Sequence, residues 1–128
     1  MENWDRIFQK IQEKVADKCP NVTQTFEVTP SALPVLLVDC RGKIDQEEAF
    51  DMEEGSQASK MVIELTAYAS GEEKLKTVRE IMKLADEEMR SMIFQRTDGP
   101  KQVTETEDST ICRYTALYER VFAEGELV

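Results

Sequence analysis

The chain has 128 residues, of which 26 are acidic and 16 are basic, so its formal net charge is −10. Hydrophobic residues make up 41% of it, too many for a disordered chain, and the length fits one domain with a single core. The longest apolar run, Ala32 to Val38, is far shorter than the ~20 residues of a membrane span, and the N-terminus lacks a signal-peptide layout. These features argue against a membrane protein, a secreted disulfide scaffold and a basic nucleic-acid binder.

The sequence contains no histidine and three cysteines, Cys19, Cys40 and Cys112. No two cysteines form a CxxC pair, so we expect no metal or other cofactor and a reduced, cytosolic setting. Without histidine the commonest general base is absent, and Ser-His-Asp and Cys-His catalysis are excluded. These absences favour a protein that is not an enzyme. Cys40 and Cys112 fit small apolar core positions, whereas Cys19, just before Pro20, is expected in an exposed loop.

A first amphipathic helix is predicted near the N-terminus, with Asn3 as its cap. Apolar residues recur there at spacings of three and four from Trp4 to Val15, and the helix should end before Pro20. A candidate strand follows from Val22 to Thr29. The continuous apolar run from Leu33 to Val38 then predicts a strand that is covered on both faces.

Residues 41–58 predict a long acidic loop between two strands. Six acids and one base lie between Lys43 and Glu54. A loop of this length is uncommon unless it is functional or disordered, and two interpretations stay open: a mobile, solvated loop, or an arm that orders on contact with a partner. The candidate lumen or partner-contact acids are Asp45, Glu47, Glu48, Asp51, Glu53 and Glu54, and the candidate apolar anchors of the loop are Ile44, Phe50 and Met52.

The clearest strand is predicted at residues 59–70, where apolar and polar side chains alternate. Ser70 to Glu73 then match the S-x-x-E capping box, and a long helix is predicted from about Gly71 to Met92. Its apolar stripe suits packing on the sheet, and Ala85 would allow a close approach. Local charge pairs worth about a few tenths of a kcal/mol each are expected on its outer face, among Glu72, Lys76, Glu80, Lys83 and Glu87.

The C-terminal part predicts a hairpin. Asp98-Gly99-Pro100 indicates a turn, and a polar edge or interface strand is expected from Gln102 to Glu107. The final strand is predicted from Thr110 to Phe122. The element order predicts an α+β fold, α-β-β-β-α-β-β, with a mostly antiparallel sheet, a short N-terminal helix and one long helix packed on the sheet. The candidate subunit contacts are Gln102, Val103, Thr104, Glu105 and Thr106.

This order resembles that of the tail-terminator (tail-completion or minor tail) proteins of long-tailed bacteriophages and prophages. In that family an amphipathic helix, a proline-marked entry into the second strand, a long loop, an alternating strand, a long helix and a closing hairpin follow one another. The matching stretches here cover nearly the whole chain and include Leu33-Pro34-Val35, Ile63 to Ala69, Ser70 to Glu73 and Arg113-Tyr114. The chain departs from the pattern at Met92-Ile93-Phe94, where many members place a glycine.

The resemblance implies a structural protein that forms a ring of six subunits on the tail tube. The ring would block further tube subunits by occupying their edges, and its other face would join the head. The implied partners are copies of the chain, the tail tube protein and a head-completion or connector protein. DNA would pass through the lumen without specific binding, helped by acidic side chains that repel phosphate. No membrane is implied, and the implied location is the tail or neck of the virion, after assembly in the bacterial cytoplasm.

Other functions stay open beside this one. A head-closure or other neck connector protein would share the size and the ring-forming logic. A small enzyme or ligand-binding α+β domain is supported only by the many carboxylates and by Tyr114 and Tyr118 on one face of the last strand. Those two tyrosines are as expected for packing at the edge of a core. Direct DNA binding is disfavoured by the negative charge and the lack of a basic stripe.

Overall fold

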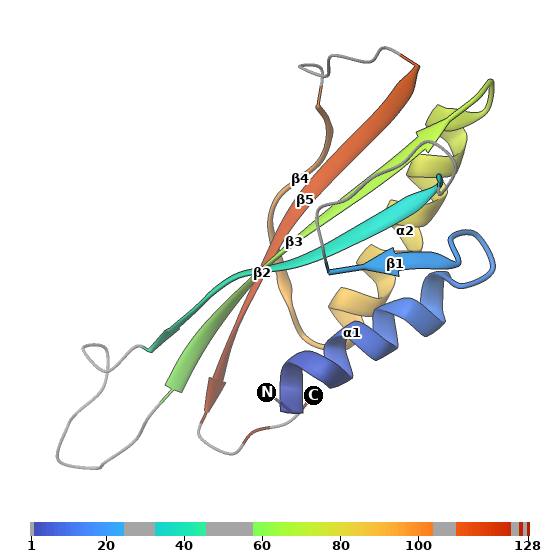
Figure 1. The fold of residues 1–128 in the computed structure, drawn as a ribbon. Helices are drawn as coiled ribbons and strands as arrows, with labels where there is room; N and C mark the ends of the chain where they lie inside the picture. The colour runs from blue at the N-terminus through green and yellow to red at the C-terminus, as the bar shows by residue number, and fades with distance from the viewer. Residues whose placement is uncertain (1, 25–32, 46–57, 104–109, 124–125, 127) are drawn as a thin grey trace, which may run out of the picture.

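The computed structural model describes residues 2–24, 33–45, 58–103, 110–123, 126 and 128 (Figure 1). Its elements follow the predicted order and confirm the α+β class. The helices are α1 (Glu2–Val15) and α2 (Lys74–Ser91), and the strands are β1 (Asn21–Thr23), β2 (Val35–Asp45), β3 (Ala58–Ser70), β4 (Gln95–Gln102) and β5 (Ile111–Ala123).

The described strands form one sheet in the order β1-β2-β3-β5-β4. Strand β1 is parallel to β2, and the other neighbours are antiparallel. The centre of the sheet is the pair β3 and β5, which keeps a single register from Ala58 opposite Ala123 to Ser70 opposite Ile111. Strands β1 and β4 therefore form the two edges.

The core lies between the sheet and the helices. Helix α2 packs along β3 and β5, and α1 packs against α2 (Figure 1). The alternation predicted for residues 59–70 is confirmed, because Met61, Ile63, Leu65, Ala67 and Ala69 all enter the core cluster. Ala85 is fully buried in the middle of α2, as expected for a close helix-to-sheet approach. Helix α1 contributes Trp4, Ile7, Ile11 and Val15 to the same core.

The two chain ends meet through Asn3, which corrects its predicted role as a helix cap. Asn3 lies inside α1. Its side-chain Nδ2 donates to the Glu126 carbonyl oxygen at 2.8 Å, and its Oδ1 accepts from the Val128 N–H at 3.2 Å. The amide therefore ties the N-terminal helix to the C-terminal segment, and Figure 1 shows the two ends close together.

Cys19 is buried, which corrects its predicted exposure. Its Sγ lies 3.4 Å from the Asn21 carbonyl oxygen and 3.6 Å from that of Pro34. Burial raises the pKa of this thiol to about 11. Cys112 is buried as predicted, and Cys40 is half-buried against the core. All three cysteines are free thiols.

The predicted acidic loop is shorter in the structure than in the sequence prediction. Strand β2 continues to Asp45, and β3 begins at Ala58, because the two strands stay paired beyond a bulge at Cys40/Gly42. The strand predicted at residues 22–29 corresponds to β1, which ends at Thr23; residues 25–29 lie outside the described part of the chain.

Helix α2 begins at Lys74, and its N-cap residue, Glu73, makes no side-chain capping bond, so the predicted capping box is wrong. The C-terminus of α2 closes in a Schellman motif: the N–H groups of Phe94 and Ile93 donate to the carbonyl oxygens of Met89 and Arg90, both at 3.0 Å. Ile93 adopts a φ of 63° there. It therefore holds the conformation usual for the glycine that the family pattern places after this helix.

Strand β4 occupies residues for which the sequence predicted a turn. Asp98, Gly99 and Pro100 lie inside the strand, at two shifts in its pairing with β5. Gly99 has a φ of 77°, and a Cβ atom there would meet the Thr115 carbonyl oxygen and lie 3.0 Å from the Ala116 Cα. The strand can therefore follow β5 this closely only with glycine at position 99.

Candidate functional site

One of the candidate acidic residues, Asp45, lies at the end of a strand of the sheet. Asp45 is the last residue of β2 and pairs with Ser59, and Ile44 pairs with Lys60. The remaining predicted acids, Glu47, Glu48, Asp51, Glu53 and Glu54, lie outside the described residues, as do the predicted anchors Phe50 and Met52. The structure therefore brings only Ile44 and Asp45 of this set onto the sheet.

The predicted interface strand is displaced toward the N-terminus. Gln102 is the last residue of β4, and Val103 continues the pairing by donating its N–H to the Arg113 carbonyl oxygen at 2.9 Å. Thr104, Glu105 and Thr106 lie outside the described residues. The edge of the sheet is formed instead by β4, seven of whose eight residues are exposed. Its glycine, proline, charged side chains and register shifts are typical of an edge that resists pairing with another strand.

The charge of the chain is distributed unevenly between the described fold and the remaining segments. Ten of the 26 acids and none of the 16 bases fall outside the described residues. The described residues therefore carry 16 charges of each sign and have no formal net charge. The sequence segments that join the strands at the two ends of the sheet carry most of the excess, with five acids in 46–57 and three in 104–109.

Most charges on the sheet face opposite the helices are paired within that face. Lys60 Nζ lies 2.9 Å from Glu119 Oε2, and Arg41 Nη1 lies 3.1 Å from Glu64 Oε2. Farther along the same face, the Arg113 guanidinium carbon lies 5.7 Å from the centre of the Tyr68 ring. This face is therefore close to electrically neutral.

Two acids of helix α2 form ion pairs with lysines in and just after α1. Lys14 Nζ lies 3.4 Å from Glu87 Oε2, and Lys18 Nζ lies 3.5 Å from Glu80 Oε2. The local pairs predicted along α2 are therefore wrong, because Glu87 pairs instead with Lys14 of α1 and Glu80 pairs with Lys18, which follows α1. Three cations of α2 are left without an acidic side chain in ion-pair distance among the described residues: Lys76, Arg79 and Lys83.

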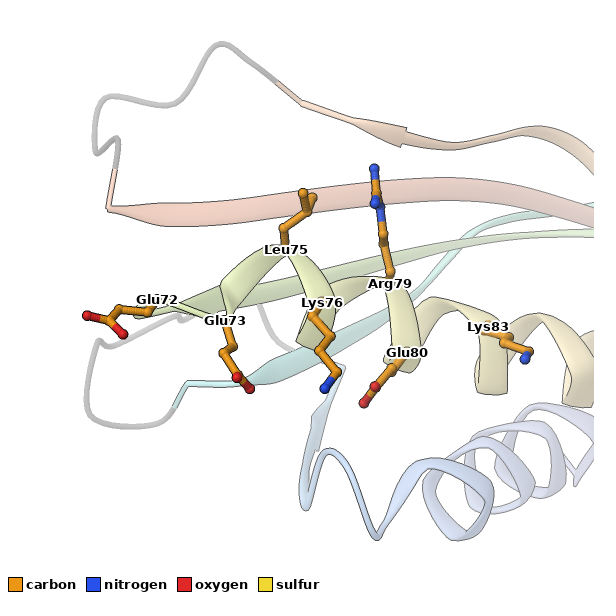
Figure 2. Close-up of a pocket in the computed structure, with 7 residues that line it drawn as sticks. All are labelled: Glu72, Glu73, Leu75, Lys76, Arg79, Glu80 and Lys83. Carbon is orange, nitrogen blue, oxygen red and sulfur yellow. The ribbon is translucent and has the colours of Figure 1, made fainter.

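A shallow groove follows the first turns of α2, and Figure 2 shows the side chains around it. Leu75, which is 39% exposed, and Arg79 project from one side of the helix, whereas Lys76 and Glu80 project from the other. Three acidic and three basic side chains line this groove. Its lining consists of Glu72, Glu73, Leu75, Lys76, Arg79, Glu80 and Lys83.

A second hollow lies between α2 and the edge strand β4, and we name it the α2–β4 hollow. Arg79 and Lys83 line both the groove and this hollow, so the two adjoin each other. Its volume is about 230 Å³. Its cations, Arg79, Lys83 and Arg96, outnumber its one acid, Asp86, and its remaining lining is Met82, Pro100 and Tyr114.

The one acid of the hollow, Asp86, already has three partners within the protein. Asp86 accepts hydrogen bonds from the Tyr118 hydroxyl at 2.5 Å and from Arg90 Nε at 2.8 Å, and Arg96 Nη1 lies at 3.3 Å. Burial alone would raise the pKa of Asp86, but these hydrogen bonds and the two arginine charges outweigh it and hold the pKa below its ordinary value. Burial, and then the bond to Asp86, raise the pKa of Tyr118. With Asp86 engaged, the accessible charge of the hollow is positive.

The two tyrosines predicted on one face of the last strand differ in burial and in contacts. Tyr118 is fully buried and bonded to Asp86, whereas Tyr114 is half-buried and lines the α2–β4 hollow. Sequence reasoning missed the roles of Asp86 and Arg96. The spacing of Asp86 and Arg90 signals a helical ion pair, but Tyr118 and Arg96 reach Asp86 only through the folding of β4 and β5 against α2.

Among the residues that the structure describes, no group of three or more acidic or cysteine side chains is placed to hold a metal ion. In the same part of the chain, no helix is both long enough and apolar enough to cross a membrane. A comparison with known protein families finds no match for this sequence, and neither does a comparison with curated proteins.

Proposed function

We propose that the chain is a structural protein of a phage or prophage tail that caps the tail tube as a ring, ends its polymerisation and forms the surface that joins the head. The order of the elements carries this proposal. The fold has the order α-β-β-β-α-β-β with α2 packed on the sheet, and that is the order which the sequence resemblance to tail terminators implies. The resemblance runs along nearly the whole chain.

The mechanism in this proposal is steric and breaks no covalent bond. Copies of the chain meet through two different surfaces, and such a head-to-tail contact closes a ring when its rotation divides the circle. The closed ring covers the edges that the next layer of tube subunits would use. Its opposite face then presents new contacts to the head-completion or connector protein.

The acids beyond the sheet have a second role in the proposal. If the 46–57 segments face the lumen, their carboxylates repel the phosphates of the passing DNA. A cryo-EM map of rings assembled on tubes tests this orientation. We expect Asp45 and at least some of Glu47, Glu48, Asp51, Glu53 and Glu54 to face the channel, and a map in which all six point outward contradicts the lumen role.

The assembly itself is tested by sedimentation across a concentration series, alone and with purified tail tubes. We expect a closed hexamer, in solution or on the tube, and electron micrographs with one density on the tube end. A chain that stays a monomer and ignores tubes contradicts the proposal. Binding to a portal-side complex instead of tube ends would identify a head-closure or connector protein, and turnover of a small compound would identify the enzyme alternative.

A further inference from the structure

The α2–β4 hollow combines an apolar lining with cations that no acid neutralises. Arg79 and Lys83 are exposed and have no acidic partner among the described residues. The third cation, Arg96, shares Asp86 with Arg90 and Tyr118. The apolar part of the lining consists of Met82, Pro100 and the ring of Tyr114. A surface of this kind is complementary to a short peptide that alternates carboxylates with one or two large apolar side chains.

We propose that the α2–β4 hollow binds the acidic segment of a second copy of this chain, residues 46–54. That segment reads Gln46-Glu47-Glu48-Ala49-Phe50-Asp51-Met52-Glu53-Glu54. Two of its carboxylates pair with Arg79 and Lys83, which leaves the others to face the lumen, and Phe50 or Met52 covers Met82 and Tyr114. The inference rests on the proposed function, because it names the two surfaces through which neighbouring copies in the ring meet.

The segment of the same copy is too short to reach the hollow. Asp45 pairs with Ser59, which pairs with Phe122, whereas β4 passes the hollow where Lys101 pairs with Thr115. Seven residues of β5 separate these two points, about 23 Å along the strand. Phe50 lies five residues beyond Asp45, a reach of at most about 18 Å, and Met52 lies six residues before Ala58, a reach of at most about 22 Å. Ala58 pairs with Ala123, which is even farther along β5 from Thr115, so neither side chain spans the distance. The occupant must therefore come from another molecule.

Charge complementarity also favours a copy of this chain. The described fold is neutral, and residues 46–57 hold five acids and no base. The other acidic connection, residues 104–109, has three acids but no apolar side chain that would match Met82 and Tyr114. The hollow and the segment 46–54 are therefore matched in both charge and apolar character.

A peptide titration tests this inference. A fluorescent peptide with the sequence of residues 45–54 is titrated with the full chain, and the anisotropy is read at low and at high salt. We expect saturable binding that weakens with salt. We expect the double variant Arg79→Gln/Lys83→Gln to weaken it about fivefold or more, as the loss of two exposed ion pairs predicts.

The matched control is Arg6→Gln/Lys10→Gln, which removes the same charge from exposed positions on α1. We expect this variant to bind like the wild type. A peptide with its carboxylates replaced by amides and a peptide of residues 104–109 should both bind more weakly. Equal binding by the two double variants, or tighter binding of the 104–109 peptide, overturns the inference.

Measuring the mass of the assembly alongside peptide binding distinguishes failure of this inference from failure of the proposed function. Hexamers that form equally well with Arg79→Gln/Lys83→Gln, together with no peptide binding, would leave the ring intact and overturn the inference alone. Specific peptide binding by a chain that never assembles and never meets a tube would overturn the ring and leave the hollow as a binding site for this segment.

Discussion

Ile93 holds a backbone conformation that suits glycine far better than a β-branched residue. Its φ is 63°, and its side chain is 73% exposed, so it gains little from burial. A β-branched side chain in the left-handed region costs about 1–2 kcal/mol, whereas the added freedom of glycine in the unfolded chain costs about 1 kcal/mol or less.

We therefore expect Ile93→Gly to raise the free energy of unfolding by up to about 1 kcal/mol, measured by urea denaturation. Ile93→Ala keeps the Cβ atom but loses the branch, and should fall between glycine and the wild type. A clear loss of stability in Ile93→Gly would show that the exposed side chain makes contacts which outweigh the strain.

Comparing alanine substitutions at Gly99 and Gly71 distinguishes the steric cost of an added side chain from the cost of its backbone conformation. Both have positive φ, 77° and 93°, but an added Cβ atom meets β5 at position 99 and nothing within 4 Å at position 71. We expect Gly71→Ala to lower the free energy of unfolding by about 1 kcal/mol, and Gly99→Ala by about 2–4 kcal/mol. Urea denaturation of the two variants checks this, and equal losses would argue against a close contact between β4 and β5.

Asp86 makes the stability depend on acid pH. Its folded pKa lies below the ordinary value of 3.8, so the folded state binds a proton less readily than the unfolded state. Its stabilising contribution is therefore complete above the unfolded pKa and is lost as the pH falls through the folded pKa.

We expect Asp86→Asn to be less stable than the wild type by about 1 kcal/mol or more at neutral pH, with the difference shrinking below about pH 4. Denaturation at a series of pH values measures it. A difference that stays constant down to pH 3 would mean that the charge of Asp86 contributes nothing. Tyr118→Phe, which removes one donor and keeps the carboxylate, should retain part of the pH dependence.

Helix α1 is held by its apolar face rather than by its ion pairs. Ile11 is fully buried, and Leu/Ile→Ala changes in cores cost about 2–5 kcal/mol. The pairs of Lys14 and Lys18 with α2 are partly exposed, and such pairs contribute about 0–1 kcal/mol each. We expect Ile11→Ala to destabilise the chain far more than Lys14→Gln/Lys18→Gln, as thermal unfolding can measure. Similar losses would assign the docking of α1 to charge.

The sequence best predicts those helices and strands whose own pattern of apolar and polar residues matches one buried face. The strand expected at 59–70 is β3 within one residue, because its alternation directly reflects one buried face. Helix α2 matches to within a few residues, although its capping box does not form. The turn predicted at Asp98-Gly99-Pro100 is wrong, because pairing with β5 overrides the turn chemistry of these residues and places them inside β4. Such an edge strand takes its structure from its neighbour rather than from its own residues.

The candidate site is less predictable from the sequence than the fold, because its charge depends on how separate segments pack together. The pattern of α2 places Arg79 and Lys83 on its outer face, but it also predicts local acidic partners for lysines of that face. Glu87 and Glu80 pair instead with Lys14 of α1 and with Lys18 just after that helix. The positive character of the α2–β4 hollow therefore follows from how α1 and β4 dock on α2, which no single segment encodes.

On the scale of the whole molecule, the described fold is neutral and the excess acid lies in the segments outside it. DNA binding requires cations that displace counterions from the phosphates, and ten additional carboxylates oppose any contact that the cations of α2 could make. We expect no retardation of duplex DNA in a gel shift even at low salt, with a basic protein of similar size as the positive control. Retardation that disappears with salt would contradict a lumen through which DNA passes freely.

The uninterrupted register of β3 and β5 restricts how the length of this chain can change. The two strands match from Ala58 to Ser70 and from Ile111 to Ala123 without a bulge. One inserted or deleted residue inside either span would turn every following side chain to the other face, and would place Ile63 or Tyr118 in water. Insertions and deletions can therefore be accommodated only outside the two spans, whatever the chain binds.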